Sequence, residues 1–131
     1  MDGLAKGYRG KKGSEAVAQI IGTMFASRDF AHRAHLKTSS YSTHKALDDF
    51  YIGVVGKADA IAEAAQGMFG KLDIPVVSLK DDINEPANGL ESQLEMIVGY
   101  GKGCEESMLL NLLDEVKVCY RTTLYKLREL N

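Results

Sequence analysis

The longest helical pattern in the chain, from about Ser42 to Phe69, restricts the fold more than any other feature of the sequence. It contains no proline and stops at Gly70, a residue type that commonly follows a helix. At about 100° per residue, its apolar side chains fall within one arc of about 100°. These side chains belong to Leu47, Phe50, Val54, Ala58, Ile61, Ala65 and Phe69. Such an arc predicts a long helix whose apolar face lies inside a helical bundle.

A second arc on the same predicted helix carries ionisable side chains. It contains His44, Asp48, Asp59 and Glu63, with Tyr51, Ile52 or Val55 between the two polar clusters. Burying such groups without partners would cost on the order of several kcal/mol for each group. This second face must therefore meet water, a metal ion or matching charges.

The two ends of this polar face are too far apart to form one site within a single chain. His44 and Glu63 stand roughly 28 Å apart along the helix, at a rise of about 1.5 Å per residue. If a second copy packs antiparallel across a two-fold axis, the histidine end of each helix meets the carboxylate end of the other. Gly53 and Gly56 lie near the expected axis, where their lack of side chains would let two backbones approach. We therefore expect a homo-oligomer formed through an antiparallel two-fold contact of this helix.

The remaining helical patterns predict an all-α fold. One helix is expected from Ser14 to about Leu36, and the Ser- and Thr-rich stretch 37–43 is expected to end it and cap the next. Residues 70–89 contain two prolines and several Asp and Asn residues, which predicts a long irregular crossover. Within it only Ile74 to Leu79 has a strand pattern, too short and too isolated to form a sheet.

Two further helices follow the crossover. The third is expected to begin at Asn88, with Glu91 completing a capping box, and to end at the glycines Gly99, Gly101 and Gly103. The fourth is expected at about Cys104 to Leu130, with acidic residues in its first turn and basic residues in its last. Together these patterns predict a four-helix bundle with one long crossover between the second and third helices.

The N-terminal residues 1–13 have the composition of a basic, glycine-rich arm. They carry four basic residues against one acid, and they have little to bury. We therefore divide the chain into an arm, residues 1–13, and a bundle domain, residues 14–131. Lys6, Arg9, Lys11 and Lys12 predict either a solvated tail, an arm docked on a neighbouring subunit or a contact with DNA phosphates.

The overall composition limits partners and location. With 16 Lys and Arg against 18 Asp and Glu, the whole molecule has no electrostatic attraction toward nucleic acid or acidic membranes. No apolar run approaches the roughly 20 residues needed to span a bilayer, and no secretion signal begins the chain, so we expect a cytoplasmic protein without membrane contact. Cys104 and Cys119 have no metal or redox spacing, and we expect reduced packing residues.

Two short motifs on the polar face carry a resemblance to a known family. His44 to Asp48 reads HKALD, and after ten residues Asp59 to Glu63 reads DAIAE. His32 stands twelve residues before His44. This HxxxD and DxxxE pattern resembles the iron site of the Dps-like miniferritins, a branch of the ferritin superfamily that oxidises and stores ferrous iron and often binds DNA.

The resemblance implies a ferritin-like bundle and a ligand set. His32 and His44 would be neutral imidazole ligands, Asp48 a supporting carboxylate, and Asp59 and Glu63 ligands from the two-fold partner. Mixed imidazole and carboxylate ligands suit ferrous iron, with zinc and manganese as further candidates. The implied function is ferrous oxidation by peroxide or dioxygen, with iron storage or protection from peroxide.

Several alternatives stay open at this stage. His35 is a rival ligand to His32, because the two lie three residues apart and can reach the same site. Tyr51 lies on the same face, either as a hydrogen-bond or radical partner or as packing. The stretch HLKTSSYSTHKALDDFY also resembles small ferritin-like proteins of unassigned role from tailed phages. The alternative function is a structural or adaptor bundle, for example phage-encoded, with a vestigial or purely structural metal site.

Overall fold

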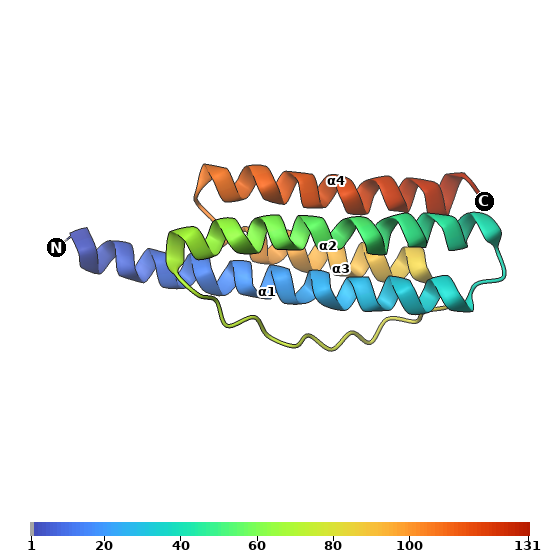
Figure 1. Ribbon diagram of the computed structural model, residues 1–131, viewed down its shortest axis with the longest axis horizontal. Helices are drawn as coiled ribbons and strands as arrows, with labels where there is room; N and C mark the ends of the chain where they lie inside the picture. Colours follow the sequence, from blue (N-terminus) through green and yellow to red (C-terminus); the bar gives the residue numbers. More distant parts are fainter. Residues whose placement is uncertain (1) are drawn as a thin grey trace.

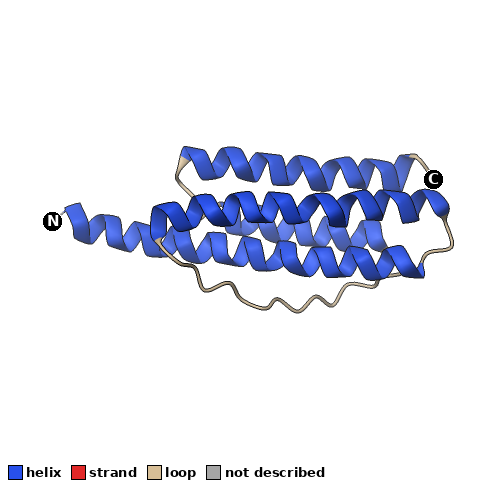
Figure 2. Ribbon diagram, viewed as in Figure 1, coloured by secondary structure: helices blue, strands red, loops and turns tan. Residues whose placement is uncertain are grey.

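The computed structural model describes residues 2–131, with side chains from Lys12 onward, and contains four helices and no strand in this range. The helices are α1 (Asp2–Lys37), α2 (Tyr41–Phe69), α3 (Pro86–Gly101) and α4 (Ser107–Glu129). Figure 2 shows that all other described residues form loops and turns. The prediction of an all-helical chain with four helices is confirmed.

Each helix contacts two others, so the four surround one common core. α1 contacts α2 and α3, and α4 contacts the same two helices. Figure 1 shows α1 and α4 running in one direction and α2 and α3 in the other, so every contacting pair is antiparallel. Residues 70–85 return along the length of the bundle beside α1, which is the predicted long crossover (Figure 1). None of the helices in residues 2–131 is long and apolar enough to cross a membrane.

The local sequence explains the limits and the inner face of α2. The Ser40 side chain caps the helix by accepting a hydrogen bond from the Thr43 amide at 3.2 Å. At the other end Gly70 adopts φ +86°, a backbone conformation that favours glycine. The buried residues are those of the predicted apolar arc, with Ala46 added and Phe69 only half-buried: Leu47, Phe50, Val54, Ala58, Ile61 and Ala65. The predicted orientation of α2 is therefore confirmed.

Three predicted helix starts are wrong. α1 begins at Asp2 rather than Ser14, so the helix continues through residues 2–13, where an arm was expected. α3 begins at Pro86, because proline suits the first helical turn; Asn88 forms no capping box, and its side-chain amide donates to Glu85 at 3.2 Å. α4 begins at Ser107 rather than at Cys104. Cys104 is therefore buried in the preceding turn, and the acidic residues Glu105 and Glu106, which were expected in the first helical turn, lie before the helix.

Two contacts hold the crossover against the helices. Gly22 of α1 is buried beneath it, and a Cβ atom added there would lie 2.6 Å from the Pro75 carbonyl oxygen and 3.1 Å from a Val77 methyl group. At the other end the Gln93 side-chain amide donates to the Asp81 carboxylate at 3.1 Å. The missing side chain at Gly22 thus allows the crossover backbone to lie directly on α1.

Substituting Gly22 tests this close approach. Alanine normally stabilises a helix interior by about 1 kcal/mol relative to glycine. We expect Gly22→Ala to destabilise the protein by about 1–3 kcal/mol instead, because the crossover backbone must move. The matched control is Gly67→Ala on α2, where no atom lies within 4 Å of an added Cβ and stabilisation is expected. Chemical denaturation measures both; equal effects of the two substitutions would contradict the predicted contact.

Candidate functional site

Two histidines join the end of α1 to the start of α2. His35 lies in the last turn of α1, and His44 lies in the first turn of α2. The His35 Nδ1 atom lies 2.8 Å from the His44 carbonyl oxygen, and the His44 Nδ1 atom lies 2.8 Å from the His35 carbonyl oxygen. The two rings stack with centroids 3.7 Å apart and planes 18° apart. We call this reciprocal arrangement the histidine clasp.

The clasp assigns the proton on each ring. A carbonyl oxygen only accepts hydrogen bonds, so both Nδ1 atoms carry the hydrogen and donate. In the neutral form of each imidazole, the Nε2 atom then keeps its lone pair. Metal-binding histidines commonly have this arrangement, in which one ring nitrogen donates to a carbonyl and the other is the ligand. The clasp thus gives two oriented imidazoles with a chemistry that suits metal ligation.

A third histidine and a tyrosine extend this cluster. His32, one turn before His35 on α1, stacks on the Tyr51 ring with centroids 4.3 Å apart. The Tyr51 ring also meets His35 edge-on at 5.3 Å, and the Arg28 guanidinium lies 5.7 Å from the tyrosine ring centre. Tyr51 therefore packs between the two helices and contacts both α1 histidines.

The Asp48 carboxylate of α2 lies beside this cluster, next to Tyr51. The neighbouring Asp48 carboxylate, first as a hydrogen-bond acceptor, raises the pKa of Tyr51 together with partial desolvation and the negative charge of Asp48, despite the opposing charge of Arg28. Tyr51 is therefore a neutral donor at physiological pH. The Lys45 Nζ atom lies 3.8 Å from the Asp48 Oδ2 atom, and this ion pair is partly exposed and weak.

The two remaining predicted ligands lie elsewhere in the chain. Asp59 and Glu63 are exposed on α2, beyond Tyr51 along the helix. Among residues 12–131, no three His, Cys, Asp or Glu side chains are placed to hold a metal ion together. One chain brings together His32, His35 and His44 near Asp48, and it leaves the DxxxE pair separate.

Among residues 12–131, no carboxylate side chain is buried inside the bundle. The buried polar or charged residues described are Thr23, Ser27, His35, Gln93 and Thr123. None of them is an acid. Any carboxylate ligand in the described part of the chain therefore lies on the surface, where a second chain can reach it.

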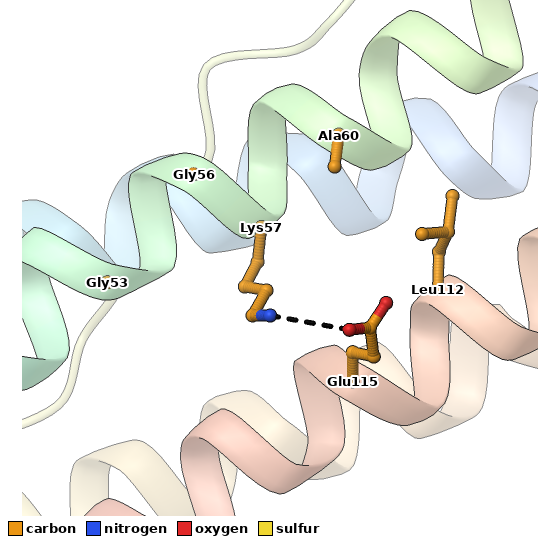
Figure 3. Close-up of a pocket in the computed structure, with 6 residues that line it drawn as sticks. All are labelled: Gly53, Gly56, Lys57, Ala60, Leu112 and Glu115. Carbon is orange, nitrogen blue, oxygen red and sulfur yellow. Dashed lines mark hydrogen bonds and ion pairs between the residues drawn. The ribbon is translucent and has the colours of Figure 1, made fainter.

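An open groove lies beside the polar face of α2. Figure 3 shows Gly53 and Gly56 lining it on α2, while Leu112 and Glu115 line it on α4. Lys57 crosses the groove to Glu115 at 3.5 Å (Figure 3). A Cβ atom added at either glycine would meet nothing within 4 Å. The predicted position of these glycines on an exposed face is thus observed, and the two-fold contact itself stays a prediction.

Sequence reasoning missed the clasp and the packing around Tyr51. The available signal was the position of His35 and His44 on either side of a short interhelical turn, which brings their carbonyls within reach of both rings. For the predicted DNA contact, the side chains of Lys6, Arg9 and Lys11 lie outside the described residues, and Lys12 is exposed on α1.

Comparison with known protein families gives a match over most of the chain. A family model described as a family of unknown function, DUF5856, matches residues 35–127. This range includes both residues of the clasp, Asp48 and the DxxxE pair, and it begins after His32. No curated protein and no solved structure matches the chain.

Proposed function

For this chain, which belongs to the DUF5856 family of unknown function, we propose the binding and oxidation of ferrous iron at a site shared by two copies. The proposed fold is the ferritin-like form of the four-helix bundle, and the proposed relatives are the Dps-like miniferritins. The observation that carries the proposal is the separation of ligands on α2: the histidine clasp and Asp48 lie at one end, and exposed Asp59 and Glu63 lie at the other.

An antiparallel second copy would combine the two halves. The histidine end of each α2 would face the partner's carboxylate end, and the symmetry would produce two equal sites. Imidazole nitrogens and carboxylate oxygens together suit ferrous iron, and manganese or zinc would bind the same donors. We keep both α1 histidines in the ligand set, because His32 and His35 both contact Tyr51 beside Asp48.

The proposed reaction is a transfer of electrons from iron to an oxidant. Two ferrous ions each lose one electron to hydrogen peroxide, which takes up two protons and gives two water molecules. Dioxygen is the alternative acceptor. In this reaction iron is the substrate and supplies the redox step, while the protein binds it and holds its ligands. In this proposal the neutral Tyr51 hydroxyl would donate to the Asp48 carboxylate and hold it at the edge of the site.

Ferrous titration of metal-free protein tests the proposal. We expect ferric absorbance to form faster than in the protein-free control, with peroxide or air as the oxidant. Light scattering on the same sample should give an assembly with an even number of subunits. A protein that leaves the rate of ferrous oxidation unchanged would contradict the proposal and favour a structural or adaptor bundle.

A further inference from the structure

The crossover contains an extended segment whose backbone has no partner. Residues 71–82 run beside α1 without helical structure (Figure 1). Among residues 12–131, no hydrogen bond engages a main-chain N–H or C=O group of residues 73–81, so these groups have no partner in this part of the chain. The segment includes the β-branched residues Ile74, Val76 and Val77, which favour strands. An extended segment with free backbone groups is a template for pairing with another strand.

Exposed and half-buried side chains alternate along the segment, as they do along a strand, with one irregularity. The outward, exposed residues are Lys71, Asp73, Val76, Ser78, Lys80 and Asp82, and Val76 is 99% exposed. The half-buried residues are Leu72, Ile74, Pro75, Val77, Leu79 and Asp81. The alternation of exposed and half-buried residues is therefore interrupted once, where the consecutive residues Ile74 and Pro75 are both half-buried. In sheets such an extra residue forms a β-bulge, one of the few positions where proline is accepted.

We propose that this segment pairs with the same segment of a second copy, as an antiparallel two-stranded ribbon whose two-fold axis passes between Val77 and its copy. A two-fold axis perpendicular to the plane of an antiparallel strand pair keeps each side chain on the same face of the pair. Such an axis must therefore place one residue directly opposite its own copy. With Val77 opposite its copy, Val76 lies opposite Ser78, and the Ile74 and Pro75 bulge lies opposite Leu79. All outward residues then face outward residues, and all inward residues face inward ones.

The charges of the segment fit this register. Beyond the bulge, Asp73 lies opposite Lys80 of the second copy, and Lys71 lies opposite Asp82. Symmetry repeats each pair, so the ribbon contains four exposed pairs of opposite charge. Opposite charges directly across a strand pair stabilise it, and like charges destabilise it. The complementarity identifies the occupant as a second copy of this chain rather than an unrelated strand.

This inference goes beyond the proposed function and needs no metal. Strand pairing uses the crossover backbone, whereas the proposed iron site uses side chains of α1 and α2. Its test is therefore made on the full chain with a chelator present.

Charge reversal with rescue tests the register. In sedimentation equilibrium, Asp73→Lys and Lys80→Asp should each weaken dimerisation about tenfold, because each replaces two attractions by two repulsions. The double variant, Asp73→Lys with Lys80→Asp, restores opposite charges and should return the dissociation constant to within about threefold of wild type. The matched control is Glu95→Lys, which reverses an exposed charge on α3 and should leave the dissociation constant unchanged. If the double variant dimerises more weakly than either single variant, the proposed register is overturned.

Hydrogen exchange tests the backbone pairing directly. At concentrations above the dissociation constant, the amides of Val76 and Ser78, which this register bonds across the ladder, should exchange at least about tenfold more slowly than in the dilute monomer. Val76→Pro removes one ladder donor and should abolish this protection. Monomeric wild-type protein at all concentrations, or a dimer with unprotected amides, would overturn the proposal. A dimer with unprotected amides would leave the expected rate of ferrous oxidation per shared site unchanged, so this result separates the two proposals.

Discussion

Mixing a His44→Asn variant with an Asp59→Asn and Glu63→Gln double variant is expected to restore about a quarter of the wild-type rate of ferrous oxidation, although each alone is inactive. In a mixed dimer of the proposed kind, one site combines an intact histidine end with an intact carboxylate end. The other site lacks both. Random exchange makes about half of the dimers mixed, and each mixed dimer has one of its two sites intact.

The substitutions are chosen to leave the fold unchanged. The amide N–H of asparagine can take the place of Nδ1–H, so His44→Asn keeps the donation to the His35 carbonyl while removing Nε2. Asp59 and Glu63 are exposed, and their amide replacements should change the free energy of unfolding by less than about 0.5 kcal/mol. Mass spectrometry confirms that subunits exchange. If exchange occurs without recovery of the rate, a site shared between chains is excluded.

The inner face of α2 was predictable because helical periodicity and burial are local and strong. The apolar residues from Leu47 to Ala65 recur at a spacing that only a helix places on one side, and the structure buries them together. The same wheel placed His44 and Asp48 on a different face from the core. Tyr51 is near the boundary of the two faces, and only the structure shows that it packs between His32 and His35.

Helix starts were less predictable because competing signals lie close together. Asn88 and Glu91 have capping-box spacing, yet Pro86 fits the first helical turn without needing an N–H group, and the helix begins there. Glu105 and Glu106 suit a helix N-terminus, but burial of Cys104 in the preceding turn delays the helix to Ser107. The clasp was not predictable from periodicity, because it depends on how two helices meet at a turn.

A large loss of stability is expected when the inner face of α2 is altered instead of its polar face. Phe50 is 1% exposed and meets the buried Tyr120 ring edge-on, with ring centres 4.9 Å apart. Burial raises the pKa of Tyr120, so this ring stays neutral and the contact is between uncharged groups. Phe50→Ala removes the aromatic pair and leaves a cavity that the surrounding helices fill only in part.

We expect Phe50→Ala to lower the free energy of unfolding by about 3–5 kcal/mol, measured by chemical denaturation of metal-free protein. The matched control is Phe25→Ala on α1, which removes the same ring from a side chain that is 45% exposed and should cost less than about 1.5 kcal/mol. A Phe50→Ala effect no larger than the control would mean that α2 does not pack through this face. A large effect at Phe50, with near-neutral effects at Asp59 and Glu63, would separate the two faces: one stabilises the chain, and the other is free to bind.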